Sequence, residues 1–424
     1  MPIKISTMRS IDFWAGVPLC AFATALLRIW KLFQPVIPRP ICRILFIELS
    51  EIGSTILAGP AMRKARDQLK AELFFVTFEV NSTSIALVGM IPPSNVFIIR
   101  SDSLVHLARD SIAFLAWARR NAIDTVIDLE LFSRFSALLT GCCGAGRTVG
   151  FYRFRNEGLY RGNMLTHRVA YNPHIHIAKG YIALVDALLS REVTVPYSKT
   201  LIADTELVFS IPPPNDAALT SMLERTCLRV PGYDPQRNRL VLINPNSGDL
   251  LPQRRWSPAR YSELIKRILV DHKDVFILVT GSADDRNSAA DLVARVGSNR
   301  CASFAGETDI SDLPSLYALS TLMVTNDSGP AHIAAATNLP TIVLFGPETP
   351  KLYAPLGAAR VLYAGLACSP CATAYNHRNT VCTDNVCMQS ISVDAVFSEV
   401  KSVLSLNRLS REERCIMTSA TPSN

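Results

Sequence analysis

The residues most able to do chemistry follow a short apolar run, Leu322–Val324, in the second half of the chain. Asp327, Ser328 and Gly329 come soon after it, and His332 lies in the first turn of the small-residue helix expected next. A helix that begins there presents free N–H groups and a positive dipole end, which suit a phosphate. The same residue types also build ordinary capped turns, so a βαβ unit without a ligand is the alternative.

Two more polar loops follow strand-like runs in this half. Ser247, Gly248 and Arg254 come after its first expected strand, and hydroxyl, backbone and guanidinium donors of this kind bind phosphates. Asp284 and Asp285 lie just beyond its second strand. The carboxyl ends of parallel strands are the edge where open α/β sheets bind ligands. Arg254 taken alone is typical of a solvated basic turn.

Four cysteines lie close together near the end of the chain. Cys368, Cys371, Cys382 and Cys387 begin with a C-x-x-C pair and fall within about twenty residues. This spacing predicts a structural zinc ion held by four thiolates, since four protein ligands leave no position open for catalysis. An iron–sulfur cluster and two disulfides are the alternatives, and unrelated surface cysteines would be the bland interpretation.

Strand-like and helix-like runs alternate along most of the chain, which indicates βαβ units and parallel sheets. The length of 424 residues is too great for one ordinary core. We therefore expect an α/β protein with two Rossmann-like domains. The expected parts are an N-terminal apolar and basic segment, a first domain, a proline-containing linker, a second domain that includes the cysteine cluster at 368–387, and a disordered tail, at residues 1–40, 41–210, 211–238, 239–405 and 406–424.

Composition narrows the partners and the compartment. The net charge of +7 is mild and the basic residues are dispersed, so we expect no nucleic-acid partner, whereas phosphorylated ligands or an anionic membrane surface fit. The 11 cysteines are an odd number and seven of them are scattered. This argues for a reducing compartment rather than a secreted disulfide framework.

The N-terminal segment contains the apolar run Phe13–Leu27, flanked by basic residues. The run is shorter than the roughly 20 residues that a spanning helix needs, and Pro18 interrupts it. One interpretation is a helix in the membrane interface, with Trp14 and Trp30 at headgroup level. The other is a core helix that docks on the C-terminal domain.

The ordered stretch N-D-S-G-P-A-H-I-A-A-A, followed by P-T-I-V-L-F-G-P-E-T-P, resembles the signature of glycosyltransferase family 9. That family contains the ADP-heptose:lipopolysaccharide heptosyltransferases. The resemblance covers the chain from about Ile41 to about Val400. It implies a GT-B-type fold, in which two Rossmann-like parallel-sheet domains face a central cleft, and inverting transfer without a catalytic metal.

The resemblance also implies roles for the polar loops of the second domain. Arg254 matches a basic residue two positions before a tryptophan, and Asp327 and His332 match the acid and histidine that contact the donor sugar and phosphates. Asp284 or Asp285 resembles an acidic residue that reaches the nucleotide ribose. The expected donor-binding set is Ser247, Gly248, Arg254, Asp284, Asp285, Asp327, Ser328, Gly329 and His332.

The first domain departs from the family pattern. The family's first loop usually carries Gly-Asp, and that aspartate is the expected general base, but here Ser54 follows Gly53. A neutral hydroxyl does not accept a proton at pH 7, so a neighbour must substitute or the protein is inactive. Glu51 in the same loop is the expected base and Glu48 ranks second, although Glu51 could simply cap a helix. The catalytic candidates are Glu51, Asp327 and Ser54.

Together these patterns predict an inverting glycosyltransferase that moves a heptose-like sugar from an ADP-heptose-like donor to a lipid-linked or polysaccharide acceptor such as lipopolysaccharide. We expect it to be cytoplasmic and peripheral on the inner face of the cytoplasmic membrane. A catalytically impaired binding protein with a GT-B fold, or a transferase that uses a UDP- or GDP-sugar, is the alternative.

Overall fold

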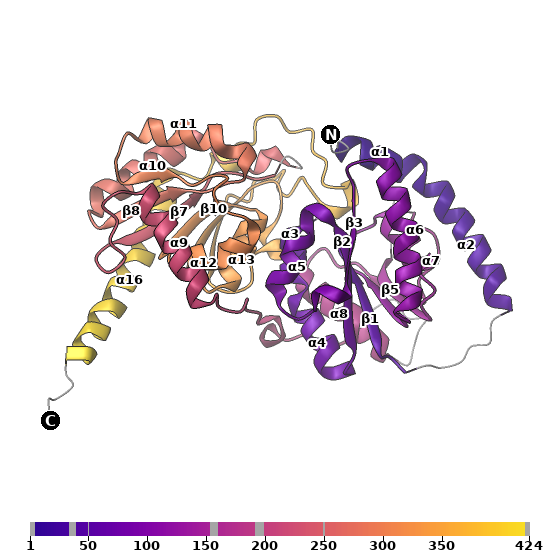
Figure 1. Ribbon diagram of the computed structural model, residues 1–424. Helices are drawn as coiled ribbons and strands as arrows, with labels where there is room; N and C mark the ends of the chain where they lie inside the picture. Colours follow the sequence, from indigo (N-terminus) through magenta and orange to yellow (C-terminus); the bar gives the residue numbers. More distant parts are fainter. Residues whose placement is uncertain are drawn as a thin grey trace, which may run out of the picture. The chain divides into compact units, whose positions relative to one another are not determined.

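The computed structural model describes residues 5–33, 40–49, 51–152, 160–190, 199–248 and 251–419. The chain divides into two compact units, Met1–Phe209 and Ser210–Asn424, and each is described by itself (Figure 1). The N-terminal segment belongs to the first unit. The stretch expected to be a linker, residues 211–238, belongs to the second unit and contains helix α9 (Asp216–Arg229).

The first unit is built on a six-stranded sheet in the order β3-β2-β1-β4-β5-β6, and every described pairing is parallel. This is the strand order of a Rossmann fold, whose switch point lies between its first and fourth strands. The central strands are continuous apolar runs because helices cover both faces of the sheet. The strands are β1 (Arg43–Ile47), β2 (Glu72–Phe78), β3 (Val96–Ile99), β4 (Thr125–Asp128), β5 (Arg147–Tyr152) and β6 (His167–Ala170).

Helices cover this sheet on both sides: α6 and α7 lie on one side, and α3, α4 and α5 on the other (Figure 1). Phe114 and Ala118 of α6 and Leu139 of α7 belong to the apolar core above β1, β2 and β4. The helices that cover this sheet are α3 (Ile52–Leu57), α4 (Gly59–Leu69), α5 (Ser82–Val88), α6 (Leu104–Arg120), α7 (Arg134–Cys142) and α8 (Ile177–Leu189).

The N-terminal segment forms two helices, α1 (Ile5–Trp14) and α2 (Gly16–Leu32), which pack against α7. Cys20 and Ala23 are buried against Ala137 and Met164. The apolar run is therefore helical, but it docks on the first unit; the alternative of docking on the C-terminal domain was wrong. Length and composition alone would let Thr7–Ile29 cross a membrane, although the helix breaks at residue 15.

The second unit repeats the same plan, with strand order β12-β11-β10-β7-β8-β9 and parallel pairings throughout the described residues. Its first and fourth strands, β7 and β10, are again neighbours. The strands are β7 (Arg239–Asn244), β8 (Val275–Val279), β9 (Cys301–Ser303), β10 (Leu322–Asn326), β11 (Thr341–Phe345) and β12 (Ala359–Tyr363). The helices are α10 (Pro258–Asp271), α11 (Arg286–Val296), α12 (Leu313–Ala318), α13 (Gly329–Ala336), α14 (Pro350–Tyr353), α15 (Val386–Gln389) and α16 (Val393–Ser419).

The C-terminus differs from the expected disordered tail. Helix α16 continues from Val393 to Ser419, so residues 406–419 of the expected tail are helical, and its residues 420–424 lie outside the described part of the chain. The first turns of this helix are held by core contacts: Val396, Val400 and Leu404 are fully buried in the second unit's core. The two parallel α/β sheets confirm the predicted fold class.

Candidate functional site

The strongest candidate site lies at the carboxyl edge of the second sheet. Strand β10 lies between β7 and β11, and all three run parallel, so the loops that follow them meet at one edge. These loops contain Arg254, Asp327 and Glu348. The edge includes the switch point between β7 and β10, where open α/β sheets bind ligands.

A buried guanidinium joins these three loops. Arg254 Nη1 lies 3.5 Å from Asp327 Oδ2 and 3.4 Å from Glu348 Oε2, and it donates to the carbonyl oxygen of Asp327 at 3.3 Å. Arg378 Nε lies 3.2 Å from Glu348 Oε1. Asp327 and Glu348 are only 3% and 2% exposed, so the site has two cations and two carboxyl groups almost out of contact with water.

Burial and mutual repulsion change which of these groups is charged. Burial raises the pKa of Glu348 to about 8, with Arg254 opposing the shift and the neighbouring Asp327 adding to it. Burial raises the pKa of Asp327 as well, but Arg254 opposes this rise. At neutral pH Glu348 is therefore largely protonated, so its carboxyl group offsets little of the charge of the Arg254 and Arg378 guanidiniums. A water-poor cluster that contains two guanidinium groups suits an anion.

Buried polar atoms without hydrogen-bond partners also indicate a ligand site here. Ser247 Oγ and Arg254 Nε are buried and have no hydrogen-bond partner among the described residues. Buried polar atoms of this kind ordinarily have a partner, so their clustering at one sheet edge indicates that a ligand supplies it. Gly248 has open space on its side-chain side, which leaves room for a group next to Ser247.

The turn that carries Arg254 is fixed by its neighbours. Trp256 is buried, and its backbone N–H donates to Asn326 Oδ1 at 3.2 Å, while Asn326 Nδ2 donates to the carbonyl oxygen of Pro245 at 2.7 Å. Arg255 donates through Nη2 to the carbonyl oxygen of Ser247 at 2.9 Å. These contacts tie the β7 loop to the end of β10 and hold Arg254 beside Asp327.

The other predicted donor residues vary in how closely they join this group. Ser328 precedes the start of α13 at Gly329 and has no side-chain capping bond, and His332 is buried on that helix. Asp285 Oδ2 accepts from the N–H and hydroxyl of Ser282, which commits the carboxylate to its own turn. Asp284 is exposed in the loop after β8, and β8 is the strand next to β7 in the sheet.

Glu348 and Arg378 were missed by the sequence reasoning. The signal available for Glu348 was its place in the Gly-Pro loop after β11, at the same edge as Asp327. No spacing rule links Arg378 to these loops, because it reaches Glu348 from a segment without regular secondary structure.

The cysteine segment packs on the Arg254 turn. Gln253 Nε2 donates to the carbonyl oxygen of Cys382 at 2.9 Å, and Cys371 N donates to that of Pro347 at 3.0 Å. The cysteines of the segment are free thiols, so the two-disulfide alternative is not what the structure has. Within the described residues, no three His, Cys, Asp or Glu side chains are grouped closely enough to hold a metal. A zinc site would therefore need this segment to close further.

In the first unit, Ser54 is buried, and its Oγ donates to Glu51 Oε2 at 2.9 Å. Glu51 is partly exposed at the start of α3, and Glu48 is buried just beyond β1. Ser50 lies outside the described residues. A carboxylate that sequence reasoning missed, Glu130, adjoins this loop: its Oε1 accepts from the N–H of Leu49 at 2.8 Å.

Comparisons with known proteins identify the family of the chain. The model of "Glycosyltransferase family 9 (heptosyltransferase)" matches residues 116–381. The chain is 36% identical over 115 residues to lipopolysaccharide heptosyltransferase 2 of Escherichia coli, covering 26% of this chain and 32% of that one. It is 34% identical over 108 residues to lipooligosaccharide heptosyltransferase 2 of Haemophilus influenzae, covering 25% and 31%. The matched part thus spans about a third of these relatives.

The chain also resembles solved structures over most of its length. The ADP-heptose lipopolysaccharide heptosyltransferase II of Escherichia coli gives a TM-score of 0.63 at 19% identity, covering 86% of this chain and 99% of that one. The family 9 glycosyltransferase of Veillonella parvula gives 0.64 at 19% identity, covering 86% and 98%. At this identity the likeness shows the GT-B fold.

Proposed function

Because the chain belongs to glycosyltransferase family 9, we propose that it is an inverting glycosyltransferase that moves a heptose-like sugar from an ADP-sugar to lipopolysaccharide or another cell-envelope glycan. The observation that carries this proposal is the buried Arg254 between Asp327 and Glu348, with unpartnered donor atoms beside it. These groups suit the diphosphate of a nucleotide sugar, which must be bound and then stabilised as it leaves.

The chemistry divides between two tasks. An acceptor hydroxyl oxygen attacks the anomeric carbon, the bond from that carbon to the diphosphate oxygen breaks, and its electron pair stays with the nucleoside diphosphate. Arg254, Arg378 and the N–H groups at the start of α13 would stabilise that charge, so the proposal needs no catalytic metal. Asp327 would hold the sugar. The acceptor proton needs a base.

The test is direct binding of ADP-, UDP- and GDP-sugars and the free diphosphates to the full chain, followed by transfer to lipopolysaccharide acceptors. Arg254→Ala should weaken nucleoside diphosphate binding by about 1.5–3 kcal/mol, roughly 10- to 150-fold in Kd, because a charged hydrogen bond is lost. Arg254→Lys, which keeps the charge, should lose less. Arg267→Ala removes a surface guanidinium paired with Glu263 and serves as the control.

Two outcomes would change the proposal. Unchanged binding in a folded Arg254→Ala variant would place the diphosphate elsewhere. A chain that binds a nucleotide sugar but transfers from none would favour a catalytically impaired binding protein, which the serine at position 54 also suggests. A preference for UDP or GDP over ADP would keep the reaction and change the donor.

We also propose that the protein lies on the inner face of the cytoplasmic membrane through α2. Its inner side is buried at Cys20 and Ala23, whereas its outer side exposes an apolar stripe to solvent. Arg28 is exposed beside that stripe, so its charge complements anionic lipid. The stripe consists of Leu19, Phe22, Leu26 and Ile29, each at least half exposed.

A further inference from the structure

The turn after β4 brings a carboxylate to the switch point of the first sheet. Strands β1 and β4 are parallel neighbours, so Leu49 and Glu130 leave the sheet at the same edge. The N–H of Leu49 donates to Glu130 Oε1 at 2.8 Å. Glu130 therefore occupies the position in this Rossmann-like unit where a bound substrate is expected, beside the loop whose usual aspartate is absent.

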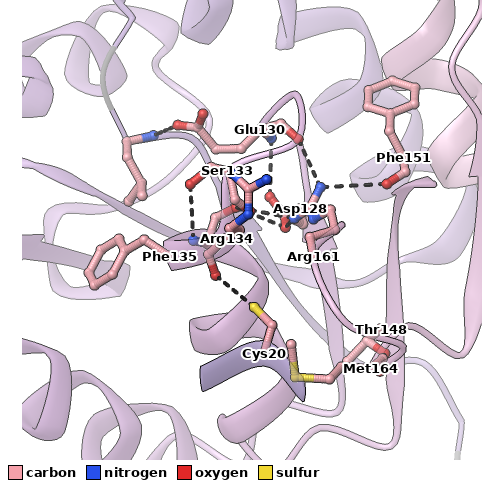
Figure 2. A network of polar contacts seen from close by, with 12 residues as sticks. Cys20, Asp128, Glu130, Ser133, Arg134, Phe135, Thr148, Phe151, Arg161 and Met164 are labelled. Carbon is pink, nitrogen blue, oxygen red and sulfur yellow. Dashed lines mark hydrogen bonds and ion pairs between the residues drawn. The ribbon is translucent and has the colours of Figure 1, made fainter. Parts of the chain in front are cut away.

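A buried network fixes this turn (Figure 2). Arg161 Nη2 is ion-paired with Asp128 Oδ2, which also accepts from Ser136 Oγ at 3.0 Å. The N–H of Glu130 donates to Asp128 Oδ1 at 3.1 Å, and Arg161 Nη1 donates to the carbonyl oxygen of Glu130 at 3.2 Å. The backbone of Glu130 is thus clamped from both sides by a salt bridge that water barely reaches.

The end of the turn is strained. Phe132 is fully buried with φ of 66°, in the left-handed region that bulky side chains rarely adopt. Such a conformation persists only when its surroundings hold it, and it is common at functional sites. Here the strain redirects the chain into α7, which starts two residues later, and leaves Glu130 at the edge rather than in a continuing strand.

Within the described residues, one oxygen of the Glu130 carboxylate accepts a hydrogen bond and the other does not. Oε1 is held by Leu49, whereas Oε2 has no hydrogen-bond partner among the described residues, and the side chain is partly exposed. Burial raises the pKa of Glu130 to about 7, with a further rise from Asp128 and opposition from the Leu49 N–H and Arg161. Glu51 differs, because its Oε2 already accepts from the Ser54 hydroxyl.

We propose that Glu130 is the general base of the transfer and replaces the carboxylate that position 54 lacks. This inference rests on the proposed function. As the acceptor oxygen bonds to the anomeric carbon, its proton passes to Glu130 Oε2, the bond to the diphosphate breaks, and the diphosphate leaves with that electron pair. Solvent then takes the proton from Glu130, so the products are the glycoside, the nucleoside diphosphate and one proton.

Arg161 and Asp128 are positioning residues in this scheme, because they hold the turn and do not reach the reacting oxygen. A base whose pKa lies near the working pH combines a useful ionised fraction with a strong pull on the proton. The charged and titratable groups that act on Glu130 come from four places: Asp12 of α1, Asp128 of β4, Arg161 before β6, and Tyr181 of α8.

The test compares three variants of the full chain with the parent: Glu130→Gln, Glu130→Asp and Glu51→Gln. The amide oxygen that Glu130→Gln introduces can still accept from the Leu49 N–H, so this variant should fold and bind donor within about twofold of the parent. Its kcat should fall by at least about 100-fold, the low end for a lost base. Glu51→Gln should lose less than about fivefold, and Glu130→Asp should lie between the two.

The pH dependence separates a base from a structural residue. The kcat of the parent should fall about tenfold per pH unit below pH 7, as Glu130 is protonated, and the residual rate of Glu130→Gln should lack this limb. Near-parental kcat in folded Glu130→Gln, or a hundredfold loss in Glu51→Gln alone, would overturn the assignment. If the parent itself transfers from no nucleotide sugar, the proposed function fails instead.

Discussion

The stability advantage of Glu130→Gln over the parent protein should grow as the pH rises. The Glu130 carboxyl has an ordinary pKa of 4.5 that the folded protein raises to about 7. Below pH 4.5 the group is protonated in both states, so nothing is lost. As the pH rises towards 7, the unfolded chain releases the proton while the folded chain keeps it, so the ionisable group lowers the free energy of unfolding.

The size of the effect follows from the shift. At about 1.4 kcal/mol per pH unit, and allowing for partial solvent exposure, the group lowers the free energy of unfolding by about 2 kcal/mol between pH 5 and pH 8. The amide of Glu130→Gln does not titrate. The difference in unfolding free energy between variant and parent should therefore grow by about 2 kcal/mol over this range, in favour of the variant.

Urea unfolding at pH 5, 6.5 and 8 measures this difference, and peptide-resolved hydrogen exchange of β1 and β4 assigns it to the first unit. Glu79→Gln, the same chemical change at an exposed position, is the control. A variant-minus-parent difference that stays constant within about 0.5 kcal/mol would show that Glu130 is an ordinary solvated carboxylate. The predicted combination of higher stability and lower turnover is the trade-off expected of a strained active-site group.

Two other predictions concern the N-terminal helix and the cysteine segment. Phe22→Gln combined with Leu26→Gln should reduce binding to vesicles that contain anionic lipid by at least tenfold without unfolding the protein. Leu201→Gln, at a 91% exposed leucine outside α2, should leave this binding unchanged. Equal binding by the parent, the double variant and Leu201→Gln would refute the membrane role of the stripe. Protein purified without chelator should contain about one zinc per chain, lost in Cys371→Ser and kept in Cys227→Ser; free thiols at all four clustered positions with neither zinc nor iron would contradict this.

The architecture was predictable because buried parallel strands are continuous apolar runs, and most of them stand out in the sequence. Two strands do not stand out, and both lie at sheet edges. His167–Ala170 alternates buried and half-buried residues, and Ala359–Tyr363 is half-buried throughout. An edge strand has one neighbour and less cover, so its apolar run is less continuous. The last turns of α16 were missed because residues 407–419 show no apolar period.

The site residues were predictable only where a single segment of the sequence contains the recognisable pattern. The loop from Asp327 to Gly329 could be recognised by itself, and Arg254 could be matched through the tryptophan that follows it. Glu348 becomes a partner of Arg254 only when β7, β10 and β11 are known to be neighbours. Glu130 is the same case: it resembles a surface charge beyond a strand until the sheet order places β4 beside β1.

The docking of α1 joins the helices proposed to bind the membrane to the turn that carries the proposed base. Asp12 Oδ1 accepts from the N–H groups of Arg134 and Phe135 at 3.0 and 2.9 Å, and Oδ2 accepts from Arg134 Nη1 at 3.1 Å. Arg134 is 1% exposed, so removing α1 would strip a buried guanidinium of this carboxylate at the start of α7.

That position lies only four residues after Glu130. Deleting the N-terminal helices would therefore disturb the turn that holds the proposed base as well as any lipid contact, and loss of activity in such a truncation would not identify the membrane as its cause. Substitutions on the outer side of α2 leave Asp12 and the buried side intact. These substitutions separate the two roles, because they change the exposed stripe of α2 and leave the contacts of Asp12 with α7 in place.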